Sequence, residues 1–132
     1  MVKQRIEIPM YRYTLYLIKL SFEDYKGEKP TTSKMGMRNS PIYLEDMVCD
    51  DIDENIKDEC LNGAITCHCG DSRKMVVLFY PMKDEDITTE VYEHEKRHVE
   101  DYILEHLDIN DMEAAAYLAG YLGKIFWKFR NK

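Results

Sequence analysis

The sequence has no long hydrophobic run. Nowhere do its apolar residues approach the ~20 consecutive positions that a membrane-spanning helix needs. The first residues also lack the apolar core of a signal peptide, so we expect a cytoplasmic chain with no membrane partner. Cysteine is limited to four positions, which in a cytoplasmic chain are expected to be reduced thiols rather than a disulfide framework: Cys49, Cys60, Cys67 and Cys69.

Positive charge is scarce relative to negative charge. The 18 lysines and arginines are outnumbered by 25 acidic residues, which gives a formal net charge of −7. A protein that binds nucleic acid without sequence preference needs a basic surface to replace phosphate counterions. The charge balance therefore argues against non-specific nucleic-acid binding, and we expect no nucleic-acid partner.

Hydrophobic periodicity divides the chain into a strand-rich first half and a helical second half. Residues 6–20 alternate with period two, which predicts a strand that begins near Met10. Residues 64–69 and 75–80 are apolar segments on either side of a Gly-Asp-Ser turn and predict a β-hairpin. The polar residues 21–40 are typical of a long loop, and the acidic residues 45–59 of a solvated face or short helix.

Two helices are expected after the hairpin. Thr88 or Thr89 is a suitable N-cap for the first, which should end near His106. Residues 108–111 interrupt the pattern and cap a second helix that begins at Met112, and so short a connection makes the helices antiparallel neighbours. The expected fold is α+β and a single domain, 1–132. A small, mainly antiparallel sheet within 6–80 precedes a two-helix half, 88–130.

Residues 94–98 read His-Glu-Lys-Arg-His, an HExxH pattern inside the first helix. Positions i and i+4 lie on one helix face, so His94 and His98 point the same way and can share one metal ion. Glu95 lies about 100° around the helix, where it can reach a water on the metal rather than the metal itself. Two nitrogen ligands and a general base are typical of a zinc-dependent hydrolase. We therefore predict Zn²⁺ as cofactor, with His94 and His98 as ligands and Glu95 as the catalytic base.

A zinc site needs a further protein ligand. Glu113 opens the second helix, and from there a glutamate can reach back to a metal on the first, so it is the predicted third ligand. Gly120 and Gly123 are among the small residues expected to let the helices approach closely. Asp101, three residues after His98, is the alternative, although it is better placed to orient an imidazole. The sequence leaves the choice between Glu113 and an acidic residue of the first helix open.

The order His94, Glu95, His98 and then Glu113 on a second helix resembles the minimal zincins of the gluzincin type. It is similar to small metallopeptidase-like domains of phages and mobile elements, including the ImmA/IrrE-type peptidases. Residues 113–122, Glu-Ala-Ala-Ala-Tyr-Leu-Ala-Gly-Tyr-Leu, resemble a signature of phage-encoded members, and residues 6–11 resemble their first strand. The resemblance implies a zincin-like fold in which a compact sheet precedes the HExxH helix. It also implies zinc on the two histidines and Glu113, with Glu95 as base.

Two functional hypotheses follow. The first is a zinc metallopeptidase that hydrolyses peptide bonds through a metal-activated water, with Glu95 as base. Tyr117, one turn after Glu113, is its second candidate catalytic residue, because a phenol can donate to a substrate carbonyl. The second is a catalytically inactive zincin-like scaffold that serves as an interaction or virion-associated protein. It rests on Lys96 and Arg97, whose positive charges oppose a divalent metal.

The run Cys67-His68-Cys69 is a second pattern of metal-ligand residue types. Structural zinc is usually bound by cysteine pairs with two to four residues between them, and no second pair is nearby. On a strand Cys67 and Cys69 share one face while His68 points away. We therefore interpret the two cysteines as buried free thiols.

Overall fold

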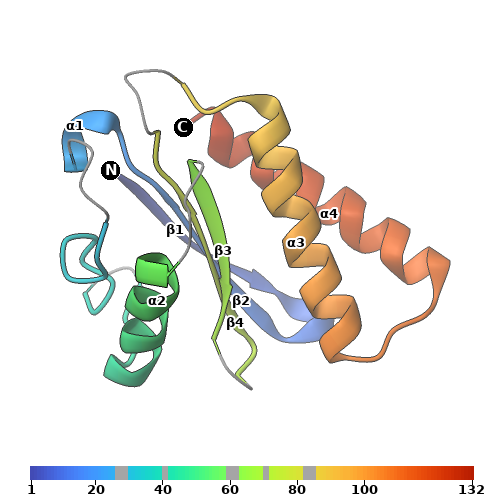
Figure 1. Cartoon of the computed structure of the whole chain (residues 1–132). Coiled ribbons are helices and arrows are strands. Elements are labelled where there is room, and N and C mark those ends of the chain that lie inside the picture. Colours follow the sequence, from blue (N-terminus) through green and yellow to red (C-terminus); the bar gives the residue numbers. More distant parts are fainter. Residues whose placement is uncertain (26–29, 40–41, 59–62, 70–71, 82–85) are drawn as a thin grey trace. The chain divides into compact units, whose positions relative to one another are not determined.

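A computed structural model describes residues 1–25, 30–39, 42–58, 63–69, 72–81 and 86–132. They form two compact units, Met1–Ile87 and Thr88–Lys132. The first unit contains a four-stranded sheet with short helices, and the second consists of two long helices (Figure 1). The predicted α+β class, with a small sheet followed by two helices, is confirmed. No helix in the described ranges is both long and apolar enough to cross a membrane.

The sheet has the strand order β1-β2-β4-β3. Its strands are β1 (Val2–Ile8), β2 (Tyr13–Lys19), β3 (Ala64–His68) and β4 (Lys74–Phe79). β1 pairs with β2 and β3 with β4 in antiparallel fashion, so the predicted hairpin of β3 and β4 is confirmed. The central strands β2 and β4 run parallel. The sheet is therefore mixed, because two of its three pairings are antiparallel and the middle one is not.

The first strand of the chain lies earlier than the sequence pattern predicted. Residues Pro9–Tyr11 form a 3-10 turn, and Arg12 follows in the left-handed conformation with φ of 54°. This turn separates β1 from β2, so no strand begins at Met10 as predicted. β1 carries charged Lys3, Arg5 and Glu7 at alternate positions. Charged side chains are common on edge strands because they discourage pairing with other chains. In β1 they interrupt the apolar pattern, so the pattern did not predict this strand.

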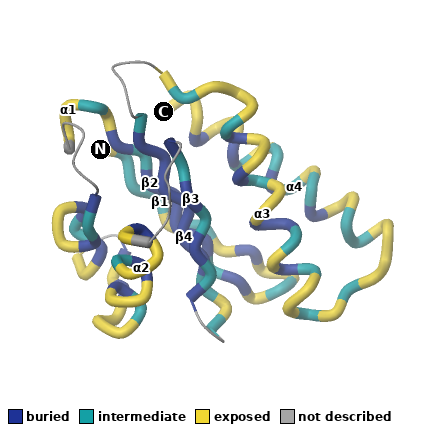
Figure 2. The backbone as a smooth tube through the Cα atoms, viewed as in Figure 1, coloured by how far each residue is buried: buried dark blue, intermediate teal, exposed yellow. Residues whose placement is uncertain are grey.

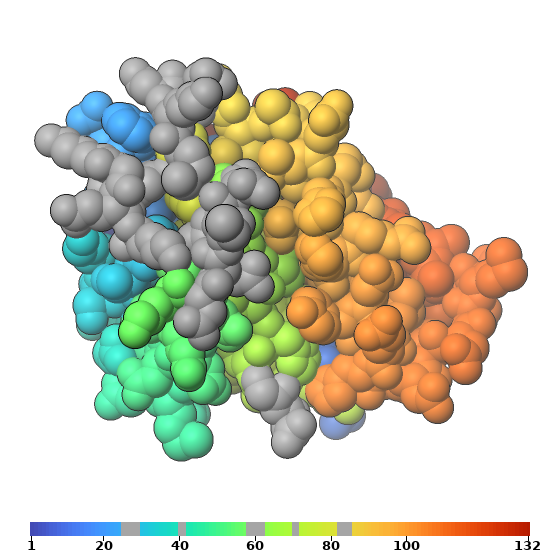
Figure 3. Space-filling view, viewed as in Figure 1, coloured from blue at the N-terminus to red at the C-terminus, as the bar shows by residue number. Residues whose placement is uncertain are grey.

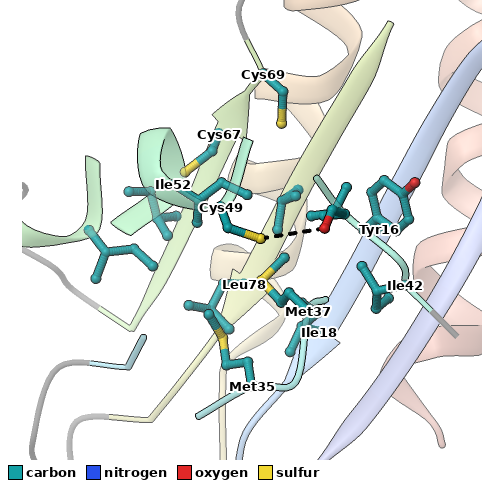
Figure 4. Packing of buried hydrophobic residues seen from close by; sticks show 14 of the residues in the cluster. Tyr16, Ile18, Met35, Met37, Ile42, Cys49, Ile52, Cys67, Cys69 and Leu78 are labelled. Atoms are coloured by element: carbon teal, nitrogen blue, oxygen red, sulfur yellow. Dashed lines mark hydrogen bonds between the residues drawn. The ribbon is translucent and has the colours of Figure 1, made fainter. Parts of the chain in front are cut away.

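One face of the sheet packs against the helix α2 (Asp46–Asp58) and against Met35, Met37, Ile42 and Leu44 (Figure 4). The acidic segment is thus a short helix, one of the two predicted alternatives, and Cys49, Ile52 and Ile56 form its buried side. The opposite face of the sheet is also buried and apolar, through Tyr13, Leu15, Leu17, Met75, Val77 and Phe79. Strands buried on both faces have nearly continuous apolar sequences, as β2 and β4 do.

A carboxylate clamp anchors the segment before α2. This segment follows the four-residue helix α1 (Phe22–Tyr25), which lies within the predicted loop 21–40. Thr32 is fully buried, and both its backbone N–H and its hydroxyl donate to the Asp53 carboxylate, each at 2.7 Å. Arg38 adds an ion pair to Asp46 at 2.6 Å. The two bonds from Thr32 satisfy polar groups that would otherwise be buried without partners, and with the exposed Arg38–Asp46 pair they tie residues 31–39 to α2.

The described cysteines are buried free thiols, which confirms the interpretation of Cys67 and Cys69. The Cys49 thiol donates to the Leu44 carbonyl across 3.9 Å. Burial, with a smaller contribution from the Asp51 carboxylate, raises the pKa of Cys69 to about 12. This thiol is therefore protonated and unreactive at neutral pH. Cys60 lies outside the described residues.

We predict that Asp53→Ala lowers the free energy of unfolding by about 2–4 kcal/mol, because it leaves the buried N–H and hydroxyl of Thr32 without their charged acceptor. Urea unfolding of the full chain, followed by circular dichroism, measures the change. Glu54→Ala, at the exposed neighbouring position of α2, is the matched control and should change stability by less than about 0.5 kcal/mol. Equal effects of the two substitutions would contradict the clamp.

Candidate metal centre

The second unit is an antiparallel pair formed by α3 (Thr89–His106) and α4 (Met112–Arg130). Both helices lie where the sequence predicted them. Thr88 occupies the N-cap of α3, although its side chain makes no capping bond. Asp111 caps α4 by accepting from the backbone N–H of Glu113 at 2.9 Å. Each helix has a buried stripe and an exposed face, which alternate along the tube in Figure 2.

The far ends of the helix pair are joined by Arg130. Its guanidinium donates to the Thr89 hydroxyl and lies 5.5 Å from the centre of the Tyr92 ring. The last turn of α4 therefore lies beside the first turn of α3. The buried stripes are Tyr92, Glu95, Val99, Glu100 and Ile103 on α3, and Leu118, Leu122, Phe126 and Phe129 on α4.

His94 and His98 meet on the exposed face of α3. Their Nε2 atoms are 3.0 Å apart, so one imidazole donates to the other. The ring centres are 4.6 Å apart and the rings are nearly perpendicular, at 80°. Figure 3 shows the side chains of α3, coloured yellow to orange, at the molecular surface. The predicted spacing of the two histidines therefore gives two nitrogen donors at a common point.

Glu95 lies on a different side of α3 from the two histidines. It is 6% exposed and belongs to the buried stripe with Tyr92 and Val99. Each residue advances the helix by about 100°, so the position after His94 turns from the exposed face toward the buried one. The structure thus separates the predicted base, which is buried, from the predicted ligands, which are exposed.

Glu113 and Tyr117 lie on exposed positions of α4, and Tyr117 is 65% exposed. With Arg130 beside Thr89, the first turn of α4, which holds Glu113, belongs to the end of the pair where α3 finishes at His106. That position is about 12 Å along the axis from His98, at 1.5 Å per residue. A glutamate side chain does not span this separation. The structure therefore does not bring Glu113 together with the histidine pair.

No group of three or more His, Cys, Asp or Glu side chains suited to a metal occurs within the described residues. The carboxylate of Asp101, the alternative ligand, instead forms an ion pair with Arg97, whose Nε lies 3.2 Å from Oδ1 of Asp101. Of the predicted ligand set, only His94 and His98 meet. A complete zinc site of three ligands from one chain remains a prediction.

The two cations inside the motif have carboxylate partners one helical turn away. Lys96 contacts Glu100 at 3.1 Å, and the two side chains are 13% and 7% exposed. Arg97 contacts Asp101 at the surface, where the two side chains are 74% and 48% exposed. Both pairs have i,i+4 spacing, which is a signal for such pairs that can be read in the sequence. The positive charges of Lys96 and Arg97 are therefore largely balanced by neighbouring carboxylates.

No family model, curated protein or solved structure matches this chain. The resemblance to zincins therefore rests on the motif and on the helices that carry it.

The expectation that Gly120 and Gly123 allow close approach of α3 and α4 is wrong. A Cβ atom built on either glycine meets no heavy atom within 4 Å. We predict that Gly120→Ala and Gly123→Ala each raise the free energy of unfolding by about 0.5–1 kcal/mol, because alanine reduces the entropy lost on forming the helix. Thermal unfolding of the two variants tests this, and a loss of stability would show that the glycines do contact a neighbouring element.

The buried pair of Lys96 and Glu100 should contribute far more to stability than the exposed pair beside it. We predict that Glu100→Gln lowers the free energy of unfolding by about 2–3 kcal/mol, because it leaves the Lys96 ammonium buried without its counterion. Asp101→Asn is the matched control, with an expected loss below about 0.5 kcal/mol. Denaturant titration measures both, and similar losses would contradict this assignment.

Proposed function

We propose that this chain is a zinc-binding protein that resembles the zincins in its HExxH helix and uses the metal to hold a protein partner. One observation carries the proposal: the Nε2 atoms of His94 and His98 are 3.0 Å apart on an exposed helix face. Zinc–nitrogen bonds of 2.0–2.1 Å in a tetrahedral site place two ligand nitrogens about 3.3 Å apart. A small outward rotation of the rings would therefore admit zinc.

The same geometry supports binding more strongly than it supports hydrolysis. A catalytic zinc site usually has three protein ligands and one open position. The described residues bring two imidazoles together, and Glu113 lies in the first turn of α4. The buried position of Glu95 also argues against hydrolysis, because a general base must reach the proton that it accepts.

Peptide hydrolysis is the second candidate, and the glutamate that directly follows the first ligand favours it. Bound zinc would supply Lewis acidity and an activated water. Glu95 would accept a proton at its carboxylate and deliver it to the leaving amine. Hydrolysis requires the Glu95 side chain to turn out of the buried stripe.

Calorimetric titration with zinc chloride tests the binding proposal. We expect His94→Ala and His98→Ala each to weaken zinc binding at least tenfold, because each removes one of two nitrogen donors. His106→Ala is the matched control, since it removes an exposed histidine from the same helix, and it should bind zinc as the wild type does. Wild-type affinity in the first two variants would overturn the proposal.

Glu95→Gln separates the two candidates in the same set of proteins. Both candidates expect this variant to keep its zinc. Digestion of a peptide library by the zinc-loaded wild type, with no digestion by Glu95→Gln, would establish the peptidase. Equal inactivity of the two proteins, each with zinc bound, supports the scaffold.

A further inference from the structure

The histidine pair is a half-site for a tetrahedral metal. Structural zinc is almost always held by four protein ligands. Within the described residues, α3 supplies two nitrogens and no third group joins them. Because both imidazoles are exposed, donors from another molecule can reach the same point.

We propose that zinc joins two copies of this chain, with His94 and His98 of each copy supplying the four nitrogens. The inference rests on the proposed zinc-binding function and names the protein partner as a second copy. A two-fold axis through the metal makes the arrangement closed, because each copy then offers the same i,i+4 pair. Four equivalent imidazoles also satisfy the preference of zinc for nitrogen ligands without any carboxylate from α4.

The charges around the pair make this association depend on the metal. Glu90, Glu93 and Asp101 lie within four residues of a histidine at exposed or half-buried positions of α3, and Arg97 is the cation at an exposed position among them. Two such faces repel each other, and the whole chain carries a formal charge of −7. A divalent cation between them offsets part of this negative charge. Without metal the copies should therefore stay apart.

Sedimentation velocity of the full chain, in EDTA and with added zinc chloride, tests the proposal. We expect the 15.7 kDa chain to sediment as a monomer in EDTA and to double its mass with zinc. Elemental analysis of the dialysed dimer should give about one zinc for two chains, as four ligands per metal require. Excess EDTA should restore the monomer.

Three variants identify the ligands. His94→Ala should remain monomeric with zinc, whereas His106→Ala should form the dimer as the wild type does. Glu113→Gln should also form the dimer, since the proposed site does not use that carboxylate. Loss of zinc binding in Glu113→Gln would instead show that one chain completes the site by itself.

The outcomes separate this inference from the function on which it rests. One zinc per chain with no change in mass overturns the shared site but leaves zinc binding by His94 and His98 in place. A chain that binds no zinc overturns both. A zinc-dependent dimer that survives His94→Ala places the metal elsewhere and also overturns the proposal.

Discussion

The antiparallel register of α3 and α4 controls which side chains of the helical unit can meet. Five residues, 107–111, connect the helices, Asp111 caps the second, and Arg130 returns to Thr89. The helices therefore run antiparallel, with the last turn of α4 beside the first turn of α3. This alignment leaves the histidine pair near the middle of α3 and Glu113 near the turn. The distance between them follows from the hairpin itself, because a helix rises about 1.5 Å per residue.

Within α3, the helical repeat divides the HExxH pattern between two environments. Four residues separate His94 from His98, so both imidazoles share the exposed face. One residue separates His94 from Glu95, which turns the carboxylate toward the buried stripe. The two imidazoles thus face solvent while the Glu95 carboxylate is packed in the buried stripe. This separation is why a role in binding agrees better with the geometry than a role in hydrolysis.

Two ion pairs with i,i+4 spacing balance the charges of α3 around the motif. Lys96 and Glu100 neutralise each other where little water reaches them, while Arg97 and Asp101 do so at the surface. A buried ion pair adds little net stability, but the loss of one partner is costly. The packing of the helix therefore constrains Lys96 in the middle of the motif, independently of any function of the histidines.

Local patterns made much of this protein predictable. The helices, the Asp111 cap and the β3–β4 hairpin each depend on residues close together in sequence, and each was found where the pattern placed it. The acidic segment also resolved into a helix because Cys49, Ile52 and Ile56 recur at helical spacing. β1 was missed because its alternating charges, which suit an edge strand, conceal the apolar signal on which strand prediction depends.

The sequence by itself determined that His94 and His98 share a helix face, because that depends only on the helical repeat. Only the tertiary structure decided that β2 and β4 pair in parallel, since their residues lie far apart along the chain. It also decided that Glu113 does not join the histidines and that the glycines of α4 face open space. These outcomes depend on how one helix or strand aligns with another. The spacing of residues within one element carries no information about that alignment.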